Sequence, residues 1–74
     1  MYDQIAKQIE TAAKNRSKVA MFHYQVLINA DKLSEENPVD FCRAVGMEDS
    51  FATEFRKMIR LAKFMKRMGA RINT

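Results

Sequence analysis

Basic residues at helical spacing are the main candidates for function in this sequence. Arg56, Arg60, Lys63 and Arg67 recur every three or four residues, so on an α-helix they would form one ridge, with Lys57 beside it. Residues 55–74 contain seven Lys and Arg residues and no acid, whereas residues 1–54 contain six basic and nine acidic residues. Such a concentrated positive field attracts phosphate or an acidic protein surface. The run could also be only a solvated helix face, although solvated faces usually mix both signs.

The residues that usually carry catalysis or bind metals are sparse. The chain has one histidine, His23, and one cysteine, Cys42, and the adjacent acids Glu35 and Glu36 have no base or further ligand near them in the sequence. A nucleophilic triad or a metal site needs several such groups together. We therefore expect His23 to be a packed, hydrogen-bonded residue and Cys42 to be a small buried one. The sequence predicts no enzyme, no cofactor and no metal site.

The length of the chain limits its stability. Seventy-four residues make a single small helical domain, residues 1–74, whose core alone supplies roughly 3–5 kcal/mol. One cysteine cannot form an intramolecular disulfide, so self-association is the remaining way to add core. We find neither a secretory signal nor an apolar stretch near the roughly 18 residues that a membrane span needs. We expect a cytoplasmic protein that does not bind membranes.

Two N-terminal helices are expected. The spacing of Ile5, Ile9 and Ala12 predicts a first helix over residues 2–14, capped by Asp3. A second helix, capped by Ser17 or Asn15, should run to about Leu33 and is apolar nearly all round. One of its sides carries five core-type residues: Val19, Phe22, Val26, Ala30 and Leu33. The opposite side carries a second apolar set, which needs its own cover: Met21, Tyr24 and Ile28.

Two further helices follow in the C-terminal half. Asn37 and Pro38 are a strong start signal for a short helix that ends at Gly46, and Asp49 or Ser50 should cap a long helix over residues 50–68. The long helix has an apolar stripe for the core: Phe51, Phe55, Met58, Ala62 and Met65, with Ile59 at its edge. A second apolar set lies outside that stripe, where neighbouring helices would leave it partly in water: Leu61, Phe64 and Met68.

A short helix, a turn with glycine and a long helix are typical of a helix-turn-helix unit, here over about residues 38–68. Small Cys42 would let the two helices cross closely, Gly46 would lie in the turn, and Ala52 and Phe55 would face back toward the first helix. A plain helical hairpin is the alternative. The sequence thus predicts an all-α, compact four-helix domain that contains a helix-turn-helix unit with a long basic C-terminal helix.

The block HYQVLINADKL…DFCRAVGMEDSFATEFRKMIRLAKF resembles the small bacterial proteins grouped as helix-turn-helix-like domains, over residues 22–65. The resemblance implies a helical fold in which Ser50, Thr53, Glu54 and Lys57 occupy the groove-facing positions of a recognition helix. The acids Glu48, Asp49 and Glu54 lie in or near that segment, and carboxylates repel a phosphate backbone.

Two functions remain open from the sequence. The first is a homodimeric DNA-binding regulator or accessory factor that contacts double-stranded DNA through Ser50, Thr53, Arg56, Lys57, Arg60, Lys63 and Arg67. The second is a small protein-binding inhibitor or adaptor, from a phage or mobile element, that uses the same basic helix against an acidic protein. In either case an interface is expected at one of the two surplus apolar sets, Met21, Tyr24 and Ile28 or Leu61, Phe64 and Met68.

Overall fold

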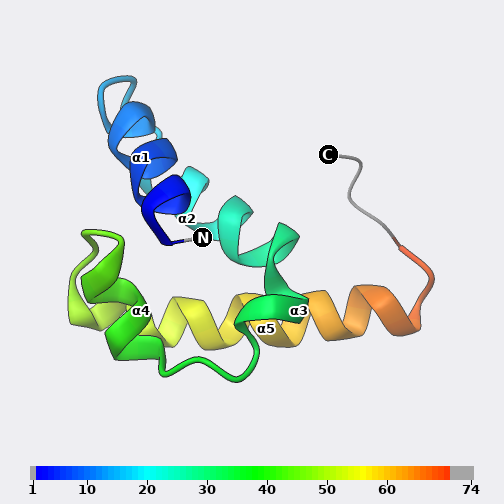
Figure 1. Cartoon of the computed structure of the whole chain (residues 1–74). Coiled ribbons are helices and arrows are strands. Elements are labelled where there is room, and N and C mark those ends of the chain that lie inside the picture. Colours follow the sequence, from blue (N-terminus) through cyan, green and yellow to red (C-terminus); the bar gives the residue numbers. More distant parts are fainter. Residues whose placement is uncertain (1, 71–74) are drawn as a thin grey trace.

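The computed structural model describes residues 2–70 of the chain. This part is built from helices and contains no strand. The elements in chain order are α1 (Tyr2–Ala13), α2 (Lys18–Ile28), α3 (Ala30–Leu33), α4 (Pro38–Ala44), the 3-10 turn η1 (Asp49–Phe51) and α5 (Ala52–Arg67), as Figure 1 shows. The predicted all-α fold is therefore confirmed, with five α-helices in the described range instead of four.

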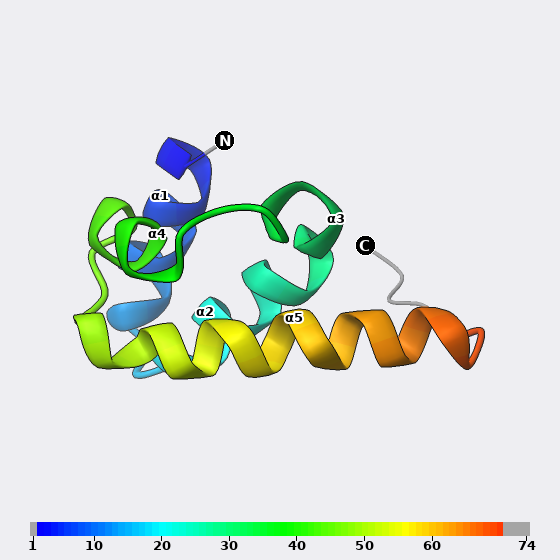
Figure 2. The same ribbon diagram turned by 90° about the horizontal axis from the view of Figure 1, so that it is seen from below.

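The long helix α5 is the element against which the others are assembled (Figure 1). The helices α2, α3 and α4 all contact it, and α1 packs on α2 and α4. In both views the last turns of α5 extend past α3 and the rest of the helical body (Figures 1 and 2). The C-terminal part of α5 therefore has less protein around it than its first three turns.

Three phenylalanines from three helices form the centre of the core. Phe22, Phe41 and Phe55 are almost completely buried, and the ring of Phe41 lies 5.1 Å from that of Phe55 and 6.1 Å from that of Phe22. Tilted aromatic pairs at such distances stabilise a core by roughly 0.5–1.5 kcal/mol beyond the area that they bury. The remaining fully buried side chains surround them: Ile9, Val26, Leu33 and Cys42.

Two details of the predicted core are wrong. Val19 is 45% exposed; it lies in the first turn of α2, at the end of the α1–α2 hairpin whose tip points away from α5 (Figure 1). Ile59, expected at the edge of the α5 stripe, is buried near its centre together with Ala52 and Phe55. Met58 is only partly buried, so the core side of α5 is rotated slightly toward Ile59.

The predicted second helix is broken at Asn29 into α2 and α3. The Asn29 side-chain Nδ2 donates to the Gln25 backbone oxygen at 2.9 Å, and the Asn29 backbone N–H donates to the same oxygen at 3.1 Å. The Asn29 carbonyl then accepts from Lys32 and Leu33, at 3.0 Å each, and starts α3. Asparagine competes for backbone groups in this way, which allows the chain to turn while Ala30 and Leu33 stay in the core.

The helix caps agree with the prediction at α4 and, in position, at α2, and they differ at α1 and α5. Asn37 Oδ1 accepts from the backbone N–H groups of Val39 and Asp40 at 3.0 and 3.1 Å, and Gly46 has the positive φ of 79° that closes the turn. Ser17 has the N-cap position of α2, but its side chain donates to the Asn15 carbonyl instead. Three other predicted caps are wrong: Asp3 lies inside the first turn of α1, and Asp49 and Ser50 lie in η1.

Candidate nucleic-acid interface

The helix-turn-helix arrangement is built by α4, the turn over residues 45–48, η1 and α5. Cys42 is fully buried in α4, and Met47 is buried in the turn, with its backbone N–H donating to the Cys42 carbonyl at 2.8 Å. Ala52 is buried at the start of α5, and Phe55 packs on Phe41 of α4. The positions predicted for this unit are therefore occupied as expected, and η1 lengthens its turn by one short 3-10 segment.

The outer face of α5 carries the predicted basic ridge. Its inner face is fixed by Ala52, Phe55 and Ile59, which are buried, so the residues between them point outward. All six predicted contact residues on α5 are exposed: Thr53, Arg56, Lys57, Arg60, Lys63 and Arg67. Ser50 is also exposed, but it belongs to η1 and not to the long helix, which corrects its predicted position.

The acid Asp49 at the start of this unit is held by an arginine. Arg43 Nε donates to Asp49 Oδ1 at 3.0 Å, and the second guanidinium nitrogen donates to Oδ2 at 2.8 Å. This paired hydrogen bond holds the pKa of the Asp49 carboxyl below its ordinary value. The charge of Asp49 is therefore compensated at the surface, and the same contact explains why its side chain does not cap α5.

The acid Glu54 lies between two cationic or hydrogen-bonding partners. Lys57 Nζ is 3.3 Å from Glu54 Oε2, and His23 Nε2 of α2 is 3.2 Å from Glu54 Oε1. The contact with Lys57, followed by that with His23, lowers the pKa of Glu54. His23 is thus a partly buried, hydrogen-bonded residue, as predicted, and it joins α2 to α5. Of the three acids near the ridge, Glu48 is the one without an ion pair among residues 2–70.

A further lysine of α5, on the side that faces α3, was not predicted. Lys66 Nζ lies 3.7 Å from Asp31 Oδ1 of α3, and both side chains are strongly exposed. Together with Lys63 it borders a shallow groove of about 190 Å³ between α3 and α5. The helical spacing places Lys66 on the side of Ile59 and Ala62, which predicts burial. Its side chain is nevertheless 76% exposed, at the border of this groove.

An apolar strip lies next to the ridge on the outer face of α5. We call Leu61, Phe64 and Met68 the α5 strip; their exposed fractions are 40%, 51% and 68%. They are exposed as their spacing predicts. The guanidinium carbon of Arg67 lies 5.8 Å from the centre of the Phe64 ring, within the range of a cation–π contact. The positive charge of Arg67 is therefore in direct contact with the strip.

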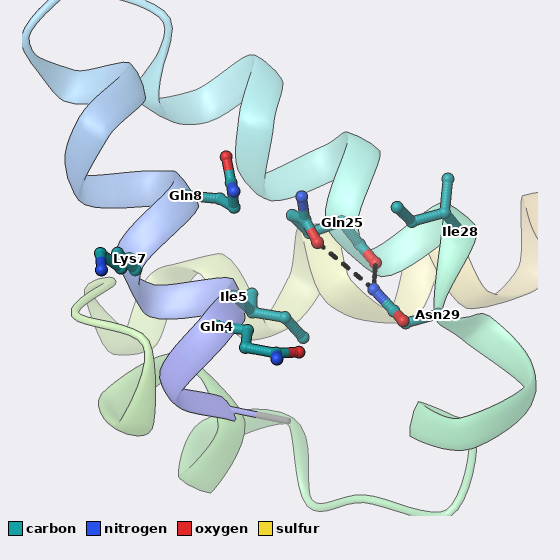
Figure 3. Close-up of a pocket in the computed structure, with 7 residues that line it drawn as sticks. All are labelled: Gln4, Ile5, Lys7, Gln8, Gln25, Ile28 and Asn29. Carbon is teal, nitrogen blue, oxygen red and sulfur yellow. Dashed lines mark hydrogen bonds between the residues drawn. The ribbon is translucent and has the colours of Figure 1, made fainter. Parts of the chain in front are cut away.

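The second predicted apolar set, on α2, is partly covered. Met21 packs against the core, which corrects its predicted place on an open surface, whereas Tyr24 is 40% exposed. Ile28 borders a groove of about 400 Å³ between α1 and α2 (Figure 3). Four carboxamide side chains line the groove with it: Gln4, Gln8, Gln25 and Asn29. Its one charged residue, Lys7, extends from α1 away from α2 (Figure 3).

Other kinds of site have little support. The described residues contain no group of three or more side chains that could hold a metal ion. Cys42 is buried, and this burial raises the pKa of its thiol, which keeps it in the unreactive form. Within residues 2–70, no helix combines the length and the apolar character that crossing a membrane requires.

The comparison with known families agrees with this geometry. A family model described as an HTH-like domain matches residues 1–68, which include all of α1 to α5. None of the curated proteins and none of the solved structures gives a match to the chain. Because the matched region covers nearly the whole chain, the protein belongs to the HTH-like domain family.

Proposed function

We propose that the protein is a small DNA-binding regulator or accessory factor of the cytoplasm, which binds duplex DNA through the outer face of α5. The observation that carries this proposal is the charge of that helix. It contains six basic residues and one acid, Glu54, whose carboxylate is already paired with Lys57 and contacts His23. The carboxylate of Asp49 is likewise paired with Arg43. Two of the three acids that would oppose phosphate are therefore compensated.

The positions on α5 suggest how the helix meets DNA. A helix of 16 residues is about 24 Å long, and a major groove accepts a helix of ordinary width. Thr53, Lys57 and Arg60 lie near the middle of the outer face, opposite the buried residues, and would reach base edges. Arg56, Lys63 and Arg67 lie together on one flank and would contact phosphates, with the Ser50 hydroxyl at the N-terminal end.

A titration against random duplex DNA over a range of salt concentrations tests this proposal. If four or five phosphates are neutralised, the logarithm of the binding constant falls against that of the salt concentration with a slope of about −0.9 per contact. Arg56→Ala and Lys63→Ala, both at proposed phosphate contacts, should each flatten the slope by about one unit. Lys14→Ala is the matched control, since Lys14 is an exposed cation in the turn after α1. No binding at about 50 mM salt refutes the proposal.

We further propose that the protein acts as a homodimer through the α1–α2 face, which we define as Tyr24, Ile28 and the four carboxamides of the groove. Tyr24 lies one turn before Ile28 on the same side of α2. A carboxamide both donates and accepts hydrogen bonds, so amides of one copy can pair with the same amides of another across a two-fold axis. A two-fold dimer would present two α5 helices to paired half-sites on DNA.

A further inference from the structure

We propose that the α5 strip binds an acidic amphipathic helix of a partner protein. This inference does not depend on DNA binding. It concerns three apolar side chains that the helical body leaves exposed on the outer side of the C-terminal half of α5. Phosphates would engage only the charges of this face, and the side chains proposed for base edges are polar, so the proposed DNA contacts give no reason for the exposed Phe64 ring and Met68 side chain.

The residues of the strip have the spacing of a coiled-coil seam, which is the line of apolar residues along which two helices pack. Leu61, Phe64 and Met68 are related by steps of three and four residues, which corresponds to positions a, d and a of a heptad. A partner helix with apolar residues at the same spacing packs onto such a seam. The seam is about 10 Å long, from seven residues at 1.5 Å each, so two turns of a partner helix cover it.

The arginines beside the strip indicate that the partner helix carries negative charge. In the same heptad, Arg60 and Arg67 have the two g positions, which face the flanking residues of a paired helix. Both side chains are exposed, and Arg67 also contacts the Phe64 ring. The sequence has no acid from Phe55 onward. Glutamates or aspartates on the partner helix would therefore meet two exposed arginines.

A second copy of this chain fits the strip poorly. In an antiparallel pair of α5 helices, g positions face each other, so Arg60 of one copy would lie opposite Arg67 of the other. Like charges at such positions are destabilising. A parallel pair would place Arg60 opposite Met65 of the other copy, which is partly buried. The strip is also too narrow for membrane insertion, because Ile59 and Ala62 of the same helix pack in or against the core.

Selection from a library of helical peptides tests the proposal with the full chain as bait. The peptides, about 15 residues long, carry fixed apolar residues at heptad spacing and random flanking residues. Peptides that bind the native chain should be enriched in Asp and Glu at the flanks. Their affinity should fall about tenfold or more for Phe64→Ser and should be unchanged for Val19→Ser, an exposed apolar residue on a different helix, α2.

Charge reversal provides the stricter part of this experiment. Arg60→Glu with Arg67→Glu should weaken the selected acidic peptides and should favour peptides with lysine flanks. Circular dichroism shows whether each variant keeps its helical fold. The proposal is overturned if enriched peptides lack acids, if they bind Phe64→Ser equally well, or if Phe64→Ser dissociates a dimer of the native chain. It is also overturned if Phe64 governs binding to anionic vesicles while the library yields no peptide.

Discussion

The α1–α2 face and the α5 strip both present apolar side chains to solvent, but their surroundings differ. Uncharged carboxamides surround Ile28 in the groove, whereas arginines border Phe64 and one of them contacts its ring. Apolar area alone does not distinguish the two surfaces, since Tyr24 and Leu61 are each 40% exposed. The polar neighbours of an apolar patch therefore indicate its partner: a neutral, self-complementary border suits a second copy, and a cationic border suits an acidic one.

The two surfaces also differ in how firmly the fold holds them. α2 packs against both α1 and α5, and Asn29 is hydrogen-bonded to Gln25 inside the groove (Figure 3). The strip lies on the outer side of the C-terminal half of α5, and the long-range ion pair in that half, between Lys66 and Asp31, is exposed and therefore weak. A partner helix on the strip would supply packing that the domain itself does not provide.

The largest expected effect is on the oligomeric state, and it distinguishes the α1–α2 face from the α5 strip. Ile28→Glu places a carboxylate in the proposed dimer interface and should weaken self-association by roughly a hundredfold, because an unpaired charge loses its water there. Phe64→Glu, a matched substitution on the α5 strip, should leave the dimer intact. Analytical ultracentrifugation at micromolar concentration measures both.

The opposite result would exchange the roles of the two surfaces. A dimer that dissociates with Phe64→Glu and persists with Ile28→Glu would show that two copies pair through α5 in spite of the arginines. A native chain that stays monomeric at all accessible concentrations would remove the dimer from the proposed function. It would leave the proposal for the α5 strip unaffected.

The fold could be predicted from the sequence where apolar spacing and strong caps agree. The start of α4 combined Asn37 and Pro38, and the structure confirms both positions. The break at Asn29 was missed because the apolar spacing continues through Val26, Ala30 and Leu33, and spacing does not reveal a side chain that bonds to its own backbone. The start of α5 was misplaced because Asp49 binds Arg43, a contact six residues away in the sequence.

For the candidate site, the sequence could predict which residues of the long C-terminal helix are exposed. The ridge and the strip follow from the positions of Arg56 to Met68 on a helical wheel. What could not be predicted is which acids are compensated, because the partner of Glu54 on α2 is 31 residues away in the sequence. The contact of Lys66 with Asp31 could not be predicted either, since it depends on where α3 lies relative to α5.

The substitution with the intermediate expected effect is in the core, at Cys42. It tests whether a change in core packing alters DNA binding or dimerisation. Cys42 is fully buried next to the crossing of α4 and α5. Cys42→Ala should lower the free energy of unfolding by about 1 kcal/mol, and Cys42→Leu should lower it by roughly 1–3 kcal/mol through overpacking. Urea denaturation measures both. DNA binding and dimerisation should stay unchanged for Cys42→Ala; loss of either in a stable variant would show that the thiol has a chemical role.

The smallest expected effect is that of substituting Glu54, the acid of α5 that contacts His23 of α2 and Lys57. Glu54→Gln frees Lys57 and removes a negative charge, so affinity for duplex DNA should rise about threefold, whereas Glu10→Gln on α1 should have no effect.

Acid titration of stability provides an independent check on the same residue. Lys57 and His23 lower the pKa of Glu54, so its contacts stabilise the fold above the ordinary pKa of 4.5. That contribution is lost as the pH falls through the lowered value, because protonation removes the charge. The native chain and Glu54→Gln should therefore differ in stability near neutral pH and converge in acid. Parallel stability curves at all pH values would mean that the carboxylate of Glu54 stabilises nothing, and that Lys57 was already free to reach DNA.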